Sequence, residues 1–283
     1  MTDVGQQTET AADEMADLFE RLAQIPADSV IGIEGDGLQR DGVRLRAPIR
    51  HGDAVVRSFA TPVLADAACG FAVARCFGGG VSGPTIELRV DHAGEPSPQA
   101  RWIIAESQVR FELNESCFLT AELTDDTGRP LAFVQGHFVV LGSPVGAQEM
   151  ERLPVLGRED LVRALHDAVS RESAEADTWT VPTDLVFSNP RLQVHGGMMM
   201  GLGELAQRRL QRADGGNVAL EAEPRPLRIT CEYLRPVPID GASVSFRTEY
   251  TRRGRRFQGL RTEVVRADGR VAAEISGLWT TRS

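Results

Sequence analysis

Residues Thr61–Phe77 read TPVLADAACGFAVARCF, and nearly all of these side chains are apolar or small. Thr61 is a suitable N-cap and Pro62 suits the first helical position, so the stretch predicts a helix that begins there. The glycines at Gly78–Gly80 follow as a helix stop. A helix that is apolar on all sides must be covered on all sides, so we expect this one to lie inside the protein.

The pattern changes period after this helix. Four segments rich in Ile, Val, Phe and Thr follow, separated by short turns, and they predict an antiparallel meander. The segments are Thr85–Asp91, Arg101–Leu113, Cys117–Thr124 and Leu131–Leu141. A strongly twisted sheet that curls around the apolar helix would supply the cover that the helix needs.

The second half of the chain repeats this order. A short apolar helix is expected over Gly196–Leu210. Four predicted strands follow it, at Leu227–Leu234, Ala242–Thr251, Phe257–Arg266 and Val271–Thr280. The turn glycines match as well, because Gly136 and Gly277 each come eight residues after the glycine of a Gly-Arg turn. Two such units can pair sheet to sheet, as a homodimer would.

The sequence therefore predicts an α+β fold made of two similar units. The expected units span residues 1–145 and 146–283, and the Pro- and Gly-containing stretch Gly142–Gly157 is the expected linker. A chain of 283 residues has the length of roughly two domains. The composition, 42% hydrophobic and 25% charged, is close to the globular average and argues against disorder.

Charge and residue usage exclude several classes of function. The net charge of −9 speaks against a nucleic-acid partner, which needs a basic face. All 31 basic residues are Arg, so a Schiff-base lysine, a PLP anchor and a P-loop lysine are impossible. The four cysteines have no CxxC spacing and the five histidines no ligand spacing, so no metal site is expected.

No apolar run approaches the ~18 residues of a membrane span, so no membrane partner is expected. The first fifteen residues, MTDVGQQTETAADEM, are polar and acidic, unlike a secretory signal. We therefore expect a cytoplasmic protein.

Each apolar helix carries one anomalous carboxylate. Asp66 is the only charge within Thr61–Phe71, and Glu204 is the only charge within Met198–Ala206. A buried, unpaired carboxylate costs several kcal/mol. Each one therefore either pairs with an arginine or a backbone cap, or faces a cleft, where burial would prepare it to act as a general base.

A polar loop leads into the second apolar helix. It reads SNPRLQVHGG over residues 188–197, so His195, Gly196 and Gly197 lie where the loop becomes helix. Glycines there let backbone N–H groups approach a ligand oxygen, and the helix N-terminus favours negative charge. The loop is thus a candidate site for a carbonyl oxygen that gains charge. A glycine-rich helix start with a hydrogen-bonded histidine is the simpler alternative.

These residues resemble a known family. Asn189, the triplet His195-Gly196-Gly197 and Glu204 are similar to the N-x5-HGG-x6-(D/E) pattern of hotdog-fold acyl-CoA thioesterases of the phenylacetate-pathway (PaaI-like) type. The resemblance covers nearly all of the second half, while the first half resembles the fold and lacks the HGG motif. It implies a double hotdog, in which two fused units, each a curved sheet around a central helix, replace a dimer.

The resemblance also implies the roles of residues. In that family the active site spans the interface between two units. The glycine after the histidine polarises the thioester carbonyl, the asparagine positions water or substrate, and the helix carboxylate acts as base or nucleophile. No cofactor is implied beyond the CoA of the substrate.

Alignment of the two halves places Asp66 opposite Glu204, Arg57 opposite His195, and His51 opposite Asn189. One cross-interface site would then be complete, and it would contain Asp66, Asn189, His195, Gly196 and Gly197. The other would combine Glu204 with His51, Arg57 and Ser58 and would lack the loop. We therefore predict one working site in each chain, with Asp66 as its carboxylate.

Two further features bear on this prediction. Some family members carry a Ser or Thr at the start of the strand after the helix, where this chain reads Arg225-Pro226-Leu227. The turn with Arg252, Arg253, Arg255 and Arg256 either holds CoA phosphates through bidentate contacts or forms a solvated hairpin tip.

The predicted function is hydrolysis of an acyl-CoA to a carboxylic acid and CoA. A hotdog hydratase or dehydratase acting on 3-hydroxyacyl or enoyl thioesters is one alternative, although its His-Phe-Pro and Asp-x4-His motifs are missing. A non-catalytic acyl-CoA-binding protein is the other. The sequence names neither the acyl group nor whether chains associate into homo-oligomers.

Overall fold

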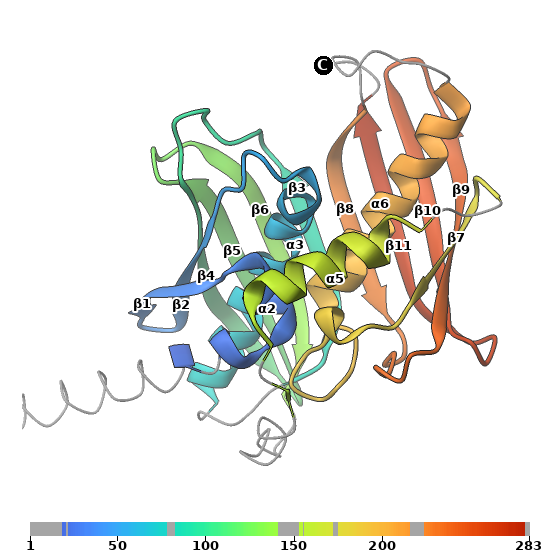
Figure 1. Ribbon diagram of the computed structural model, residues 1–283. Coiled ribbons are helices and arrows are strands. Elements are labelled where there is room, and N and C mark those ends of the chain that lie inside the picture. The colour runs from blue at the N-terminus through green and yellow to red at the C-terminus, as the bar shows by residue number, and fades with distance from the viewer. Residues whose placement is uncertain are drawn as a thin grey trace, which may run out of the picture.

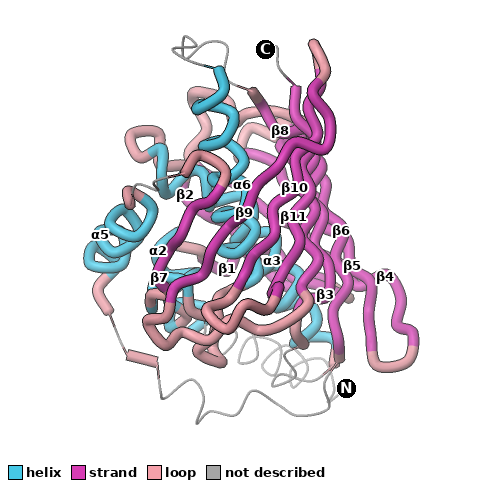
Figure 2. The backbone as a smooth tube through the Cα atoms, turned by 90° about the vertical axis from the view of Figure 1, so that its right-hand side faces the viewer, coloured by secondary structure: helices cyan, strands magenta, loops and turns pink. Residues whose placement is uncertain are grey.

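A computed structural model of the chain describes residues 19–20, 22–77, 83–140, 153–154, 156–171, 175–215 and 224–280. Its strands form one 11-stranded antiparallel sheet in the order β1-β2-β4-β5-β6-β3-β8-β11-β10-β9-β7 (Figure 1). The helices lie together on one face of this sheet (Figure 2). The predicted glycine loop at 78–80 and most of the predicted linker lie outside the described residues.

Two units of similar order make up the fold. The first unit comprises α2 (Pro26–Ile31), β1 (Glu34–Gln39), β2 (Gly42–Pro48), α3 (Ala54–Cys76), β3 (Thr85–His92), β4 (Trp102–Leu113), β5 (Ser116–Asp125) and β6 (Pro130–Val139). The second unit comprises α5 (Arg158–Val169), β7 (Thr178–Pro182), a 3-10 turn η1 (Leu185–Phe187), α6 (Gly196–Gly215), β8 (Arg225–Tyr233), β9 (Ser243–Arg253), β10 (Phe257–Val265) and β11 (Val271–Thr280). The predicted strands are found in both units, but only the last three of each set form an antiparallel meander. The first strand, β3 or β8, pairs with the last, β6 or β11.

The two units join in the middle of the sheet. Strand β3 of the first unit pairs with β8 of the second, from Glu87 opposite Glu232 to Asp91 opposite Arg228. Helices α3 and α6 pack against each other behind this junction, and both are largely buried. Sheet-to-sheet pairing of two units, as the sequence predicts, is therefore confirmed.

The strand register shows which residues of the two units correspond. Gly136 of β6 pairs with Leu88 of β3, and Gly277 of β11 pairs with Ile229 of β8. Leu88 therefore corresponds to Ile229, and Gly136 corresponds to Gly277. Counting along the strands from these residues, Thr85 corresponds to Pro226 and Phe138 corresponds to Trp279.

The helices follow the same two-fold relation. Gly197 of α6 lies against the backbone of Val63, and Gly201 lies against Phe59. If α3 and α6 are related by a two-fold axis, the contact of Gly197 with Val63 is equivalent to the contact of Phe59 with Gly201. Phe59 is therefore the counterpart of Gly197, and Val63 is the counterpart of Gly201. Counting on from Val63 and Gly201, Asp66 corresponds to Glu204 and Gly70 corresponds to Arg208.

The predicted start of the first apolar helix is wrong. Helix α3 begins at Ala54, and the side chain of Asp53 caps it by accepting a hydrogen bond from the Val56 N–H at 3.0 Å. Pro62 therefore lies inside the helix. A proline removes one intrahelical hydrogen bond, but α3 continues past it because its apolar side chains are held by the surrounding sheet.

This longer helix also corrects the statement that no segment approaches a membrane span. Helix α3, with 23 residues, is long and apolar enough to cross a membrane by length and composition. However, 72% of its most apolar window is buried inside the protein. The helix is thus the core of the first unit, where apolar residues on every side are expected.

Candidate active site between the two units

The loop before α6 is held in place by Asn189. The side-chain oxygen of Asn189 accepts hydrogen bonds from the backbone N–H groups of Arg191, at 2.9 Å, and Gln193, at 3.1 Å. This Asx-type turn competes with regular structure and shapes the loop locally. The His195 N–H then donates to the Phe187 carbonyl at 2.7 Å, which anchors the end of the loop. Asn189 therefore positions the segment that carries the histidine.

The two glycines after His195 allow α6 to approach α3 closely. A Cβ atom on Gly197 would lie 2.5 Å from the Cα of Val63 and even closer to the carbonyl oxygen of Pro62. A Cβ atom on Gly196 would lie 2.6 Å from the Asp66 carboxylate. At position 197 only glycine fits, because the neighbouring atoms are backbone, so this glycine is what lets the N-terminus of α6 approach Asp66.

Asp66 is held by groups from both units. One carboxylate oxygen accepts the Thr85 hydroxyl hydrogen bond at 2.9 Å. The other accepts the Gly197 N–H at 2.9 Å and lies 3.2 Å from Nδ1 of His195. The side chain is only 5% exposed. The predicted combination of Asp66 with His195 and Gly197 is thus found in one place, across the interface between units.

Thr85 is a site residue that the sequence analysis missed. It supplies a hydroxyl at the start of β3, the strand that follows α3, while its counterpart in the second unit is Pro226. The hydroxyl that seemed missing beside the HGG helix therefore lies in the unit that provides Asp66. Extending the alignment of the two halves from the helices to the strands would have found it.

Asp28 is a second residue that the sequence analysis missed. It lies on α2, its side chain is 0% exposed, and one oxygen lies 3.5 Å from Nε2 of His195. Neither carboxylate oxygen has a hydrogen-bond partner in the described part of the chain. Burial, reinforced by the nearby Asp66, raises the pKa of Asp28 from its usual 3.8 to about 7, against the opposing effect of His195. No sequence signal marks this residue.

This raised pKa predicts how Asp28 affects stability. The folded protein holds the Asp28 proton up to about pH 7 and the unfolded chain releases it near pH 3.8, so stability falls as pH rises between these values. Asp28→Asn cannot ionise and avoids this loss. We expect its advantage over the wild type in free energy of unfolding to grow from pH 4 to pH 7 and then level off, at about 4 kcal/mol or less, with Tm following it. Thermal unfolding by circular dichroism at several pH values measures it, and a constant difference across this range would contradict it.

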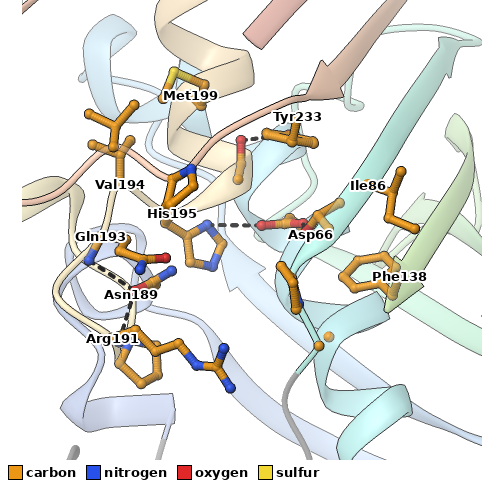
Figure 3. A pocket seen from close by; sticks show the side chains of 18 of the residues that line it. Asp66, Ile86, Phe138, Asn189, Arg191, Gln193, Val194, His195, Met199 and Tyr233 are labelled. Atoms are coloured by element: carbon orange, nitrogen blue, oxygen red, sulfur yellow. Dashed lines mark hydrogen bonds and ion pairs between the residues drawn. The ribbon is translucent and has the colours of Figure 1, made fainter. Parts of the chain in front are cut away.

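A pocket of about 480 Å³ opens at this constellation (Figure 3). His195 and Asp66 face each other at its polar end, with the Asn189 loop on one side and Ile86 and Phe138 on the other. Its wall along α3 is formed by Asp66, Ala67, Gly70, Phe71 and Ala74. The nine residues from Asp66 to Ala74 span about 12 Å of helix. The site therefore combines a carboxylate and a helix N-terminus with a long apolar wall.

Tyr233 completes the wall beside the helix N-terminus. Its hydroxyl donates a hydrogen bond to the Gly196 carbonyl at 2.8 Å. Burial raises the pKa of Tyr233 well above its usual value, so the hydroxyl remains a donor. This hydrogen bond holds the Gly196 peptide, the first of α6, in place. The Gly196 N–H is among the groups that a helix leaves without an internal acceptor, and Gly196 lines the pocket.

The corresponding position in the other half is arranged differently. Glu204 accepts two hydrogen bonds from Arg208, at 2.9 and 3.1 Å, and it does not line the described pocket. The Arg208 guanidinium also lies 4.9 Å from the ring centroid of Trp279 and donates to the Pro224 carbonyl. Arg208 and Trp279 are the counterparts of Gly70 and Phe138. A large side chain therefore fills the place that Gly70 leaves open.

The backbone donors differ as well. Gly196 and Gly197 stand at the start of α6, whereas their counterparts Ser58 and Phe59 lie inside α3, which begins at Ala54. Beyond the first turn, helical N–H groups are used by carbonyls of the preceding turn. His51, the counterpart of Asn189, contacts the Ala100 carbonyl through Nε2 at 2.9 Å. Glu204 thus has no free helix N-terminus to face.

The four arginines of the β9–β10 turn lie away from the pocket. Arg252, Arg253, Arg255 and Arg256 are exposed, and Arg253 pairs with Asp214 of α6 at 3.0 Å. Asp214 comes 18 residues after Gly196, about 27 Å along the helix. The structure therefore does not bring this turn together with the HGG loop of the same chain, and a role in CoA binding stays a prediction.

Comparison with known proteins gives a family match for part of the chain and a fold for the whole. Residues 186–281 match the family model described as the acyl-CoA thioesterase N-terminal domain. No curated protein matches the chain. An acyl-CoA thioesterase II from Mycobacterium marinum has a similar structure, with a TM-score of 0.57, 10% identity, and coverage of 92% of this chain and 98% of that one.

Two further solved structures agree. The tesB protein of Mycobacterium avium subsp. paratuberculosis has a TM-score of 0.57 at 8% identity, covering 95% of this chain and 100% of that one. An acyl-ACP thioesterase from Bacteroides thetaiotaomicron has a TM-score of 0.50 at 12% identity, covering 89% and 99%. At such identities the likeness shows the fold alone. The α+β double-hotdog prediction is thereby confirmed.

Proposed function

We propose that this protein is an acyl-CoA thioesterase with one working site in each chain. The observation that carries the proposal is the contact of Asp66 with Gly197 and His195 across the two units, at the polar end of an apolar pocket. The match of residues 186–281 to an acyl-CoA thioesterase family model supports the same class of reaction.

The chemistry follows from the positions of the donors and the carboxylate. The thioester carbonyl oxygen lies at the N-terminus of α6, where the Gly196 N–H and the helix dipole stabilise the charge that develops on it. Asp66 then removes a proton from an attacking water molecule, or attacks the carbonyl itself through a mixed anhydride. Thr85 and the Gly197 N–H hold the carboxylate in place for either step.

The acyl group lies along α3 in this proposal. The wall of the pocket beyond Asp66 is apolar, and Ile86 and Phe138 face it from β3 and β6. An aliphatic or aromatic acyl chain buried there gains free energy in proportion to the apolar area removed from water. The counterpart wall carries Arg208 and Glu204, and we infer that it binds no acyl chain.

Direct loss of thioester absorbance tests the activity. Purified protein is incubated with acyl-CoAs of short, medium and long chain length and with aromatic acyl-CoAs, and the same acyl groups on acyl carrier protein serve as a second set of donors. Turnover of at least one member of the panel is the expected result. Tight binding by calorimetry without turnover would support an acyl-CoA-binding protein instead. The PaaI-like subfamily and a cytoplasmic location remain predictions.

Gly70 offers a test of where the acyl chain lies. A Cβ atom there would meet nothing closer than Phe138, at 4.0 Å, so a larger side chain enters the pocket without striking the backbone. We expect Gly70→Leu to lower kcat/KM at least about 10-fold for the longest acyl-CoA turned over, because the added side chain occupies its volume. The shortest substrate should lose much less.

Gly70→Ala is the matched control, since its single methyl group fits and should shift the chain-length profile less. Kinetics with the same substrate panel give the result. An unchanged profile for Gly70→Leu would place the acyl group elsewhere.

A further inference from the structure

Asp28 is a buried acid that the proposed hydrolysis does not yet use. It is the third residue of α2, a short helix that packs against α3 and η1. Neither side-chain oxygen of Asp28 has a hydrogen-bond partner among the described residues. Nε2 of His195 lies 3.5 Å from one of these oxygens.

Such a residue is costly to keep. A buried carboxylate without donors destabilises a fold by several kcal/mol, so buried acids are normally paired or replaced. Among the residues that the structure describes, two basic residues of α5 are engaged elsewhere: Arg158 donates to the Ile31 carbonyl, and His166 contacts Asp53. Within the described part of the chain, Asp66 of α3 and His195 are the titratable groups that act on it. We therefore assign the role of Asp28 to its contact with His195.

We propose that Asp28 is a positioning residue that holds the Nε2–H of His195, so that Nδ1 is the nitrogen presented to Asp66. This inference rests on the proposed function. The 3.5 Å separation is longer than a good hydrogen bond, but such contacts commonly tighten when substrate binds. On the other side of the ring, Nδ1 accepts the Gly197 N–H at 3.2 Å and lies 3.2 Å from the Asp66 carboxylate.

The Gly197 contact agrees with a ring that is protonated on Nε2: this N–H donates both to Nδ1 and to the Asp66 oxygen 3.2 Å from it, so the two acceptors share one donor. A nitrogen that accepts an N–H hydrogen bond carries no proton of its own. The neutral imidazole has one ring proton, which must then be on Nε2, facing Asp28. A buried carboxylate that fixes a histidine tautomer in this way is known from the serine-protease triad.

The proton balance of the reaction assigns His195 a task. When a water molecule attacks the thioester carbon, the bond between water oxygen and carbon forms and the water proton passes to Asp66. Nδ1 of His195 can share that proton, and the Asp28 carboxylate balances the resulting imidazolium charge. When the carbon–sulfur bond breaks, the same proton passes to the CoA thiolate, so that Asp66 and His195 return to their starting states.

Nitrogen-15 NMR of the histidine rings tests the contact without any substrate. The protein is labelled at its five histidines and studied at pH 8, and His195→Gln identifies the His195 signals. We expect the wild type to show a protonated Nε2 and an unprotonated Nδ1. In Asp28→Ala we expect the proton to move to Nδ1, which then donates to Asp66. Unchanged His195 nitrogen shifts in Asp28→Ala would overturn the proposal.

Kinetics test the consequence. We expect Asp28→Ala to lower kcat at least about 10-fold with KM little changed, because the ring loses its orientation and charge balance. Asp28→Asn keeps the side-chain shape and a carbonyl oxygen that can accept Nε2–H, so its kcat should lie between those of the other two. A kcat equal to the wild type in Asp28→Ala would overturn the role, whatever the NMR result.

Two further measurements show whether a loss of kcat comes from unfolding, and whether the proposed function or the proposed role of Asp28 is wrong. The Tm of Asp28→Asn at pH 8 should not fall below that of the wild type, so a loss of kcat in that variant is not unfolding. If the wild type hydrolyses no thioester, the proposed function fails, and the NMR comparison alone decides whether Asp28 sets the tautomer of His195. The two ideas can therefore fail separately.

Discussion

Asp66→Asn is expected to lower kcat for thioester hydrolysis by about 10³-fold. The amide can neither accept the proton of an attacking water molecule nor attack the carbonyl, while it preserves the shape of the side chain. The amide oxygen can still accept the Gly197 N–H while the amide NH2 donates to the Thr85 hydroxyl oxygen, so the variant should fold. Steady-state kinetics with the best acyl-CoA of the panel measure the loss.

Glu204→Gln is the matched control, because it changes the corresponding carboxylate of the other half in the same way. We expect its kcat to stay within about three-fold of the wild type, because Glu204 faces Arg208 instead of a helix N-terminus. Its Tm should fall slightly as the pairing with Arg208 weakens. The opposite ranking, with Glu204→Gln inactive and Asp66→Asn active, would refute the assignment of the working site.

Gly197→Ala is the second large expected effect, and it concerns both stability and activity. The added methyl group would overlap the backbone of Pro62 and Val63, which cannot rotate away as a side chain could. Overpacking of this kind costs typically 1–3 kcal/mol. Forcing α3 and α6 apart also moves the Gly197 N–H from Asp66, so we expect a fall of several degrees in Tm and at least about 100-fold in kcat.

Gly70→Ala provides the stability comparison for this prediction. It is also a glycine in one of the two central helices, but its methyl group would meet only Phe138, at an ordinary van der Waals distance of 4.0 Å. Alanine also favours a helix by about 1 kcal/mol. Its Tm should equal or exceed that of the wild type. A Gly197→Ala variant as stable and as active as the wild type would mean that the close approach of the two helices is unimportant.

The main elements could be predicted from the sequence because their patterns are local. The apolar helix, the meander of alternating strands and their repetition each depend on residues near one another in the chain. The start of α3 is mispredicted because Thr61-Pro62 has the form of a helix start. The actual N-cap is Asp53, eight residues before Thr61. Which of these two residues caps the helix depends on the packing around it, and the sequence alone does not contain that packing.

The site was predictable only in part, for a related reason. The motif and the repeat indicate Asp66 together with His195 and its glycines. Asp28 leaves no trace in the sequence, because only the tertiary structure brings α2 under the HGG loop. By contrast, the pairing of Glu204 with Arg208 is an i to i+4 contact that the sequence does contain. Reading that spacing would have favoured the structural role of Glu204 at the outset.

The position of the site at the junction of the units also bears on how the chain folds. Asp66 and Gly197 are separated by 131 positions, and the sheet closes only where β3 meets β8. Contacts between distant segments form late, because the intervening chain must first be ordered. During synthesis, the β3 edge and one face of α3 in the first unit would stay uncovered until the second unit has been made. In a refolding experiment, recovery of activity should therefore lag behind recovery of secondary structure.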